Sequence, residues 1–408
     1  MRPYVSLVRR NPDFRKVYVA TLVSLGGDWF ALIPLLNLLA RETGSGLWGG
    51  LVLAADTALV ALVSPYAGSV VDRIDRRRVL VVADLISAVL VCALLLVHSE
   101  RTAWVALVAI GGVAAAKAFY LPASNAALPN LVDAPDLPAA NVLVGASWGT
   151  MLAVGAALGG LLDALLGPRT CFVIDAASFA LSAWLVARTK RAFQEGRTPQ
   201  RDPPRLVGEV RDALRYVRRT PRVAALVTVK SAVGLGNGVL PLFPLLATGA
   251  FGIGPIGTGL LFAARGLGAV LGPLAVRRWA TEERAMWRVL FGGMVAYGVT
   301  YCVFAVTPWF GIALVLVVVA HFGGGANWIM STYALQVTVP DSLRGRVFSL
   351  DFMITTLAIA ASQVTAGVLS DFVDARVLTA ASGAVTAVYG GVWWMATRRA
   401  RGSVTSAH

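Results

Sequence analysis

Residues 72–97 read DRIDRRRVLVVADLISAVLVCALLLV, which sets four arginines directly before 19 residues whose single acidic or basic side chain is Asp84. A helix needs about 20 apolar residues to cross the roughly 30 Å hydrocarbon core of a bilayer. The apolar part of this stretch is therefore predicted to be a transmembrane helix. Short cytoplasmic loops retain Lys and Arg, so the arginines place the start of this helix on the cytoplasmic side.

The same pattern recurs along the 408 residues, of which 57% are hydrophobic and 14% charged, with a mean hydropathy of +0.70. Long continuous apolar runs exclude a β-barrel, whose strands alternate. We therefore expect an all-α integral membrane protein with twelve transmembrane helices. The apolar windows cover residues 17–40, 47–71, 79–97, 102–122, 141–166, 169–187, 222–250, 254–276, 287–306, 309–332, 346–370 and 376–397.

The net charge of +14 follows the orientation of these spans. With the N-terminus in the cytoplasm, 29 of the 36 Lys and Arg residues fall in cytoplasmic segments, 4 in external segments and 3 within spans. The asymmetry predicts an inner-membrane protein with both termini cytoplasmic. It also excludes a nucleic-acid partner, because orientation and contact with anionic membrane lipids account for the charge.

The longest connection divides the chain into an N-terminal half, residues 1–187, a cytoplasmic linker, residues 188–221, and a C-terminal half, residues 222–408. Within the linker, Leu206, Val210, Leu214 and Val217 recur at spacings of three and four residues. This spacing predicts an amphipathic helix at the cytoplasmic surface. Two roles are open to this helix. It is either a simple tether between the halves or a regulatory or partner-binding element.

The chain lacks the patterns of a cofactor or metal site. Cys92, Cys171 and Cys302 lie in separate apolar runs without metal-ligand spacing, and the phosphate-binding pattern GxxxxGK[ST] is absent. No nucleophile is paired with a base. We therefore expect no metal, no cofactor and no enzymatic activity.

The loop GSVVDRIDRRRVL, residues 68–80, resembles the signature G-x-x-x-D-R-x-G-R-R of the major facilitator superfamily. Its matching positions are Gly68, Asp72, Arg73, Arg76 and Arg77, with Asp75 where that family usually has glycine. The stretches GGDWF (26–30), LPASNAALPNLV (121–132) and PDSLRGRVFSL (340–350) resemble a branch of bacterial exporters of enterobactin and macrolides. The resemblance implies two pseudo-symmetric six-helix bundles, a cavity lined by spans one, four, seven and ten, and alternating access.

The resemblance also implies a cytoplasmic latch. Asp72 would face the start of span eleven, where a helix N-terminus stabilises a carboxylate by about 0.3–2 kcal/mol. Arg73 and Arg76 would join a charge network between the bundles. Asp84 and Asp351 lie one to two turns from the cytoplasmic end of their spans, and we expect them in the same network. The alternative is that these arginines only fix the topology.

Ionisable residues inside spans are the candidate transport residues, since each costs at least about 2.5–3.5 kcal/mol at the bilayer centre and must face a partner or a cavity. Asp28 is the first candidate for proton coupling or substrate contact. The alternative is a structural ion pair with Arg265 or Lys230. Lys117 is expected near the cytoplasmic end of its span, where it would snorkel. The remaining ionisable residues are Asp56 and Asp175, and the polar groups expected in the cavity are Asn237, Asn327 and Trp328.

Together these observations predict a monomeric secondary transporter that couples protons to export of a small amphipathic compound, such as a drug-like molecule or a siderophore. A lipid or lysophospholipid flippase and a small-molecule importer are the alternative transport functions. A membrane receptor without transport is a different class, which six intramembrane charges argue against.

Overall fold

The computed structural model describes residues 2–71, 73–194, 206–276 and 282–402, and every regular element within these ranges is helical. The first half contains α1 (Arg2–Arg10), α2 (Pro12–Thr43), α3 (Leu47–Val71), α4 (Arg76–Ala93), η1 (Leu94–Leu96), η2 (Glu100–Thr102), α5 (Ala103–Leu131), η3 (Ala134–Asp136), α6 (Leu137–Leu166) and α7 (Pro168–Ala187). Then follow α8 (Leu206–Arg219), α9 (Pro221–Thr228), α10 (Ser231–Gly236), η4 (Asn237–Leu242), α11 (Phe243–Leu245), η5 (Leu246–Ala250), α12 (Pro255–Val276), α13 (Glu283–Val306), α14 (Phe310–Thr338), α15 (Asp341–Leu369), α16 (Ala375–Ala396) and α17 (Arg398–Gly402).

Eleven helical segments among the described residues are long and apolar enough to cross a membrane. The helix α16 adds a twelfth long segment of 22 residues. Large apolar side chains such as Val89, Leu165 and Val388 are exposed on α4, α6 and α16. Lipid tails are the natural cover for such surfaces, since soluble proteins rarely expose large apolar patches. The predicted all-α membrane fold is confirmed.

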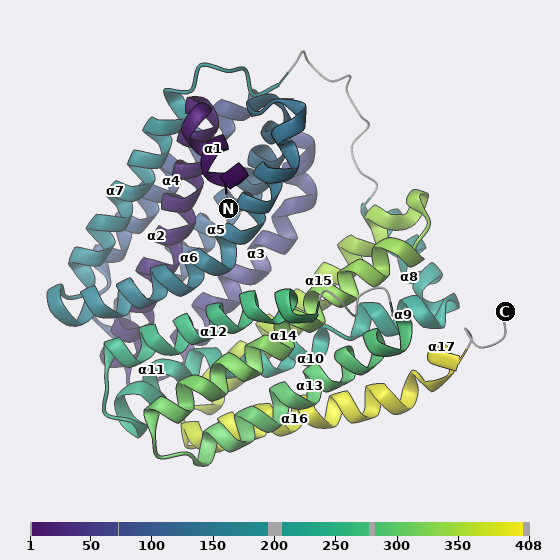
Figure 1. Ribbon diagram of the computed structural model, residues 1–408. Coiled ribbons are helices and arrows are strands. Elements are labelled where there is room, and N and C mark those ends of the chain that lie inside the picture. Colours follow the sequence, from purple (N-terminus) through teal and green to yellow (C-terminus); the bar gives the residue numbers. More distant parts are fainter. Residues whose placement is uncertain (1, 72, 195–205, 277–281, 403–408) are drawn as a thin grey trace. The chain divides into compact units, whose positions relative to one another are not determined.

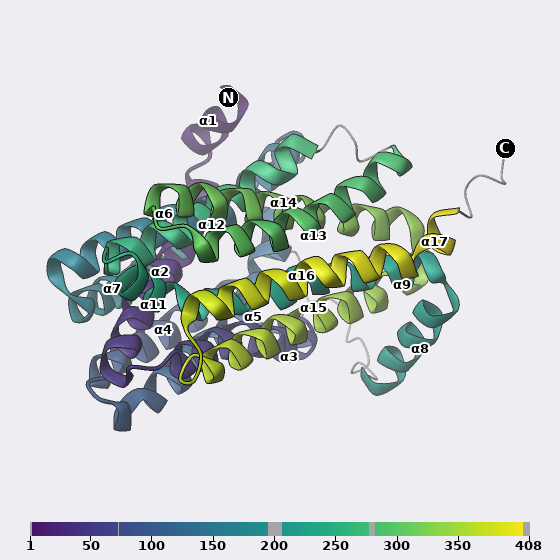
Figure 2. The same cartoon turned by 90° about the horizontal axis from the view of Figure 1, so that it is seen from below.

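The chain forms two compact units. Unit 1 contains residues 1–44, 55–204 and 258–263, and unit 2 contains residues 45–54, 205–257 and 264–408. In unit 1, α2 lies beside α6 and α7, and α4 lies beside α5 and α7 (Figure 1). In unit 2, α13 lies beside α14 and α16 (Figure 2).

Helices α2 and α4 begin at side chains that cap them. Asn11 accepts a hydrogen bond from the Phe14 backbone N–H at 2.9 Å, and Pro12 follows at the first helical position. Asp75 accepts one from the Arg78 N–H at 2.9 Å and so starts α4. Such caps contribute about 1 kcal/mol each. The aspartate that replaces the glycine of the signature loop therefore has a structural task of its own.

The predicted span 222–250 is a broken helix. It runs as α9, a turn at residues 229–230, α10, the 3-10 segment η4, the short α11 and the π-helical segment η5. Pro241 and Pro244 lack the N–H group that a continuous helix needs, and Gly236 and Gly238 weaken it further. Broken backbone at membrane depth is tolerated where protein buries it, and most of this segment is buried.

Backbone contacts between glycines join three helices of unit 2. A Cβ atom on Gly298 of α13 would lie 2.5 Å from the Gly383 carbonyl oxygen of α16, and one on Gly383 would lie 2.6 Å from the Gly298 oxygen. Gly293 of α13 and Gly323 of α14 face each other in the same way, at 2.7 Å. We call these four residues the glycine seam. Only glycine permits this approach of two helix backbones.

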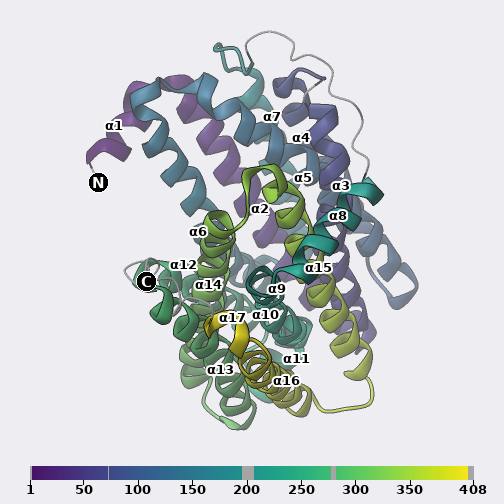
Figure 3. The ribbon, with the colours of Figure 1, turned by 90° about the vertical axis from the view of Figure 1, so that its right-hand side faces the viewer.

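The amphipathic helix predicted in the linker is α8, and it packs on protein. Figure 3 shows α8 beside α9 and α15. Ala213 and Val217 are buried in the core of unit 2, and Asp212 lies 3.7 Å from Arg346 of α15. Its apolar side thus covers the end of unit 2, which differs from a helix that only lies on the lipid surface.

Candidate functional site

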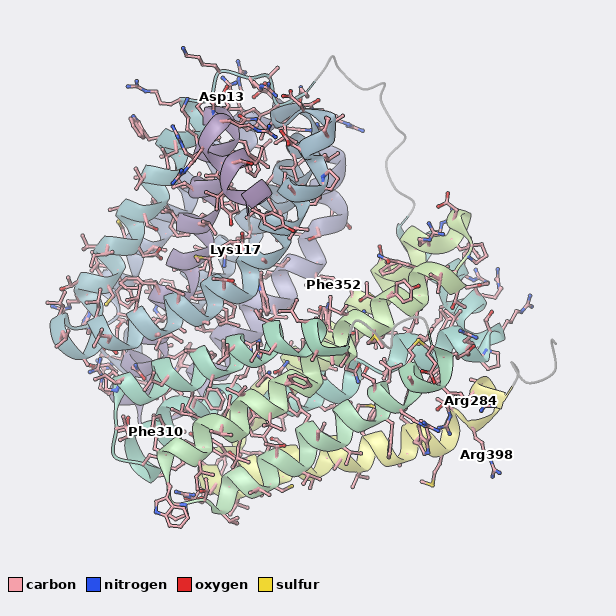
Figure 4. All side chains as sticks on the ribbon, viewed as in Figure 1. Asp13, Lys117, Arg284, Phe310, Phe352 and Arg398 are labelled. Carbon is pink, nitrogen blue, oxygen red and sulfur yellow. The ribbon has the colours of Figure 1, made fainter. Side chains whose placement is uncertain are left out.

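Three charged side chains meet inside unit 1. Lys117 on α5 places its Nζ 3.0 Å from Asp28 Oδ2 on α2 and 3.5 Å from Asp56 Oδ1 on α3. We call these residues the unit 1 triad. Figure 4 labels Lys117 about halfway along the helices, away from Asp13 near their end. The triad ties together three helices that the sequence separates by connecting loops.

The triad lies at mid-depth. Asp28 is 16 residues after the first residue of the 32-residue α2, which is about 24 Å along the helix axis. Lys117 is 14 residues after the first residue of the 29-residue α5. The expectation that Lys117 lies near the end of its helix and snorkels is wrong. Its helix continues past Pro122 and Pro129 to Leu131, because membrane helices tolerate proline.

The triad has one cation for two carboxylates. The side chains of Asp28, Lys117 and Asp56 are 9%, 22% and 25% exposed. Asp28 Oδ1 is buried and has no hydrogen-bond partner among the described residues. With both carboxylates ionised, the triad carries a net negative charge and one unused acceptor oxygen. It can therefore take up a proton or another cationic group.

A further carboxyl group packs directly against α2. Asp175 on α7 is 1% exposed and accepts a hydrogen bond from Ser178 Oγ at 3.1 Å. A Cβ atom on Gly27 would overlap Asp175 Oδ1 and lie 2.6 Å from Ser178 Oγ. The glycine that precedes Asp28 therefore makes room for a second buried acid beside the triad.

Asp84 on α4 is buried by hydroxyl groups of neighbouring helices. It accepts hydrogen bonds from Ser182 Oγ at 2.6 Å and Ser24 Oγ at 3.3 Å, and it is 1% exposed. We expected Asp84 in the cytoplasmic charge network. The structure instead places it in the interior of unit 1, where α2, α4 and α7 pack together.

Aromatic side chains of α2 and α6 pack against each other at the residue that follows Asp28. Trp29 follows Asp28, and its ring centroid lies 6.3 Å from that of Trp148 on α6, edge to face. Trp148 is 47% exposed. Met151, three residues further along α6, packs against Gly26. Neither Trp148 nor Met151 was predicted, since a lone aromatic or methionine in an apolar span gives no functional signal.

Unit 2 holds its own buried ion pair, between Lys230 and Asp351. The two side chains are 3% and 4% exposed, and the Lys230 ammonium lies 5.1 Å from the centre of the Trp328 ring. Asp28 and Lys230, which we suggested as a structural ion pair, each have a partner within their own unit. We expected Asp351 of α15 in the latch network. It is instead the buried partner of Lys230, which lies in the turn between α9 and α10.

A chain of polar aromatic contacts crosses unit 2. Tyr297 donates its hydroxyl hydrogen to Asn237 Oδ1 at 3.2 Å, and Tyr301 Oη lies 2.9 Å from His321 Nε2. The Tyr297 and Tyr301 ring centroids are 5.1 Å apart. Arg265 interacts electrostatically with both tyrosines and with His321. Arg265, the other suggested partner of Asp28, thus interacts with this cluster within unit 2.

The neighbouring residues Asn327 and Trp328 of α14 face different neighbours. Asn327 is fully buried and donates to the Leu290 carbonyl oxygen of α13 at 3.1 Å, whereas Trp328 lies against Lys230. Asn327 therefore joins α14 to α13 rather than pointing into open space.

The signature loop lies partly within the described residues. Gly68 belongs to α3, Arg73 borders a surface pocket, and Asp72 lies outside the described residues. The same pocket is lined by Asp75 and Arg78. The predicted contact of Asp72 with span eleven stays a prediction.

Arg76 and Arg77 bind the chain that follows α7. Arg76 donates to the carbonyl oxygens of Ala126 at 2.8 Å and Phe193 at 3.3 Å. Arg77 donates to the Arg191 carbonyl oxygen at 2.8 Å, and its guanidinium lies 5.1 Å from the centre of the Phe193 ring. These contacts lie within unit 1, and we call residues 188–194 the strap.

The strap is also held from α2. Asp13 accepts hydrogen bonds from the backbone N–H groups of Lys190 at 3.2 Å and Arg191 at 2.9 Å. Lys16 donates to the Arg188 carbonyl oxygen at 3.0 Å. The sequence did not indicate this role for Asp13, because a single acid after a helix cap is also favoured by the helix dipole.

The chain is similar to known membrane transport proteins. The family model described as transmembrane secretion effector matches residues 6–400. The chain is 28% identical over 373 residues to the multidrug efflux pump Tap of Mycolicibacterium fortuitum, covering 87% of this chain and 88% of that protein. It is 22% identical to macrolide efflux protein A of Streptococcus pyogenes, over 88% of this chain and 89% of the relative.

The fold is found among solved transporter structures. A bacterial homologue of the human lysosomal transporter Spinster superimposes with a TM-score of 0.74 at 15% identity, covering 98% of both chains. At this identity the likeness concerns the fold alone.

Proposed function

The chain belongs to the transmembrane secretion effector family of major facilitator transporters, and on this premise we propose that it exports a small amphipathic compound, drug-like or siderophore-like, in exchange for protons by alternating access. The names of the efflux pumps among its relatives support export. Lipid flipping and import are the competing transport functions. The relatives are transporters, so enzymatic catalysis is not part of the proposal.

The unit 1 triad carries the coupling part of the proposal. Lys117 is within 3.5 Å of two carboxylates. When a proton binds Asp28, the Lys117 ammonium retains Asp56 as its partner. Proton exchange at Asp28 therefore need not leave a lone buried cation, which would cost about 3–5 kcal/mol. A single ion pair would lack this second partner.

The other candidate residues take supporting roles in the proposal. Lys230 is neutralised by Asp351 and keeps the broken segment in place, and the cluster of Arg265 and Asn237 gives unit 2 a polar interior. Asp72, Arg73 and Arg76 remain the proposed latch, with Arg76 also fixing the strap. Residues 1–187 and 222–408 are the proposed functional halves of a monomer.

We also propose a bacterial inner-membrane location with both termini and the linker in the cytoplasm. The charge asymmetry of 29 against 4 Lys and Arg residues supports this orientation. Of the described residues, Arg9, Arg10 and the strap then lie on the cytoplasmic side.

The test is gradient-driven accumulation in inside-out membrane vesicles, with a macrolide and a cationic dye as probes. Asp28→Asn should abolish accumulation while leaving the amount of folded protein near that of wild type, since Lys117 still pairs with Asp56. The matched control is Asp371→Asn, an exposed acid in the turn after α15, which should accumulate both probes normally. Collapse of the proton gradient should reduce wild-type accumulation to the Asp28→Asn level. Normal accumulation by Asp28→Asn would refute the coupling role.

A further inference from the structure

The carboxyl group of Asp84 lies in the apolar core of unit 1, where α4 packs against α5 and α7, and α7 against α2 (Figure 1). Asp84 is 1% exposed, and the buried residues of this core include Ala20, Ala83 and Val186. None of the ion pairs among the described residues of unit 1 includes Asp84. The charged group that acts on it is a second acid, Asp28. A buried carboxylate without an opposite charge is strongly unfavourable. Asp84 therefore needs a positive charge, either a proton or a small cation.

Two serine hydroxyl groups from neighbouring helices face Asp84. Ser182 Oγ of α7 lies 2.6 Å from Asp84 Oδ2, and Ser24 Oγ of α2 lies 3.3 Å from Asp84 Oδ1. The Ser182 hydroxyl also lies 3.2 Å from the Ala20 carbonyl oxygen. A hydroxyl group carries one hydrogen and two lone pairs. Ser182 can therefore donate its hydrogen to Ala20 and turn a lone pair toward a cation beside Asp84.

A third hydroxyl group, on Tyr120 of α5, belongs to the same cluster. It interacts with Asp84 and with the hydroxyl groups of Thr21 and Ser182. Tyr120 is 5% exposed, and its Oη atom has no hydrogen bond of good geometry among the described residues. Buried tyrosine hydroxyl groups usually have a partner. The Tyr120 oxygen therefore has a lone pair for a ligand beside Asp84.

The oxygen atoms of this cluster favour a small monovalent cation over a proton. A proton on Asp84 needs one acceptor, whereas the cluster offers two carboxyl, three hydroxyl and one carbonyl oxygen. Around a hard cation held at about 2.4 Å, neighbouring oxygens of one shell lie about 3.4 Å apart, close to the 3.2 and 3.3 Å found here. One carboxylate balances one charge, so a divalent ion would leave an unmatched charge in the core. A larger ion such as K⁺ would hold the oxygens further apart.

We propose that unit 1 binds one Na⁺ ion beside Asp84, at what we call the sodium site. Its ligands are the carboxyl group of Asp84, the hydroxyl groups of Ser24, Ser182 and Tyr120, and the carbonyl oxygen of Ala20. The ion neutralises Asp84 and joins α2, α4, α5 and α7. The inference does not depend on the proposed function, because the sodium site shares no residue with the unit 1 triad and binding requires no transport.

The test is the thermal midpoint of the purified full-length protein in detergent, measured in NaCl, KCl and choline chloride at the same concentration. An ion that binds only the folded state stabilises it by mass action. At a Na⁺ concentration about fivefold above its dissociation constant, the midpoint of a unit of this size should rise by about 2–4 °C. KCl and choline chloride should both give the lower midpoint. Equilibrium binding of radioactive Na⁺ should saturate at a single ion per chain.

Two matched pairs of variants locate the site. Asp84→Asn should lose the response to Na⁺, because the amide carries no charge, whereas Asp175→Asn should keep it. Asp175 is a close control, since it is also 1% exposed and also accepts a hydrogen bond from a serine of α7. Ser182→Ala should weaken Na⁺ binding about tenfold through the loss of one ligand, whereas Ser178→Ala on the same helix should leave the Na⁺ affinity unchanged.

A further variant keeps the test decisive if Asp84→Asn does not fold. Tyr120→Phe removes only an oxygen that has no hydrogen bond of good geometry, so this variant should fold and bind Na⁺ about tenfold more weakly. Size-exclusion chromatography establishes that each variant is folded before its midpoint is measured.

Three results would overturn the inference: the same midpoint of wild type in NaCl and KCl, an undiminished response to Na⁺ in Asp84→Asn, or an equal loss of the response in Asp175→Asn. If Asp84→Asn does not fold, unchanged Na⁺ affinity in both Tyr120→Phe and Ser182→Ala overturns it instead. The vesicle assay tests the proposed function separately. Export by a protein that does not respond to Na⁺ leaves that function standing, and a response to Na⁺ without export leaves the sodium site standing.

Discussion

Removing one partner of the buried Lys230–Asp351 pair should destabilise unit 2 far more than removing both. Lys230→Met leaves the Asp351 carboxylate, 4% exposed, without a cation, and breaking a buried pair in this way costs about 3–5 kcal/mol. Lys230→Met with Asp351→Leu replaces the pair by apolar groups, which is often neutral or stabilising. The double variant also loses the contact of Lys230 with Trp328, about 2 kcal/mol when desolvated. We therefore expect its stability to lie between that of wild type and that of the single variant.

The assay is the thermal midpoint of the purified protein, followed by size-exclusion chromatography in detergent. Arg222→Ala serves as the control, because Arg222 and Glu283 form a pair at 2.7 Å whose side chains are 28% and 27% exposed. A pair this exposed should contribute about 1 kcal/mol or less. The reasoning is refuted if Lys230→Met is no less stable than Arg222→Ala, or if the double variant is less stable than Lys230→Met. The folded double variant should still export, since we assign the pair no contact with substrate.

The remaining predictions concern packing, the loop and topology. Gly27→Ala should destabilise by about 1–3 kcal/mol through overlap with Asp175, and Asp175→Ser in the same chain should restore the thermal midpoint; failure to do so would place the strain elsewhere. Arg76→Ala should speed tryptic cleavage at Lys190 and Arg191, because the side-chain hydrogen bond to Phe193 of the strap is lost together with the one to Ala126 of α5, and an unchanged cleavage rate would contradict this. Asp72→Ala should impair export while insertion stays normal, whereas unimpaired export would reduce the signature loop to a topology signal. Reporter fusions in the linker and at the C-terminus should report the cytoplasm; a periplasmic signal from the linker would refute the orientation.

The fold was predictable because it follows from hydropathy, which is local in sequence. The run after Arg78 is apolar whatever surrounds it, and most of the windows needed only small changes at their ends. The exception at span four is instructive. The apolar window closed at Pro122, whereas α5 continues to Leu131. This placed Lys117 near a helix end when it lies at the centre.

The partners inside the membrane could not be predicted, because they depend on tertiary packing. Lys230 and Asp351 are 121 residues apart, and nothing in the local sequence of either selects the other. Asp28 was correctly singled out as a buried acid, but its choice of Lys117 requires the depth of α5 to be known. Arg76 illustrates a further limit: its partners are backbone carbonyl oxygens, which carry no signature in the sequence.

The glycine seam constrains how this lineage can change. A glycine codon becomes an alanine codon by a single nucleotide substitution, yet a methyl group at Gly298 would lie 2.5 Å from the Gly383 carbonyl oxygen, where backbone cannot give way cheaply. Drift at the seam is therefore removed by selection on folding, whichever compound the cell must expel. Trp148 is half exposed and lies outside the seam, so a substitution there does not force two helix backbones apart. Substitutions that adapt the protein to a new compound are therefore expected at positions of this second kind, whereas substitutions at the seam would change the spacing of α13, α14 and α16.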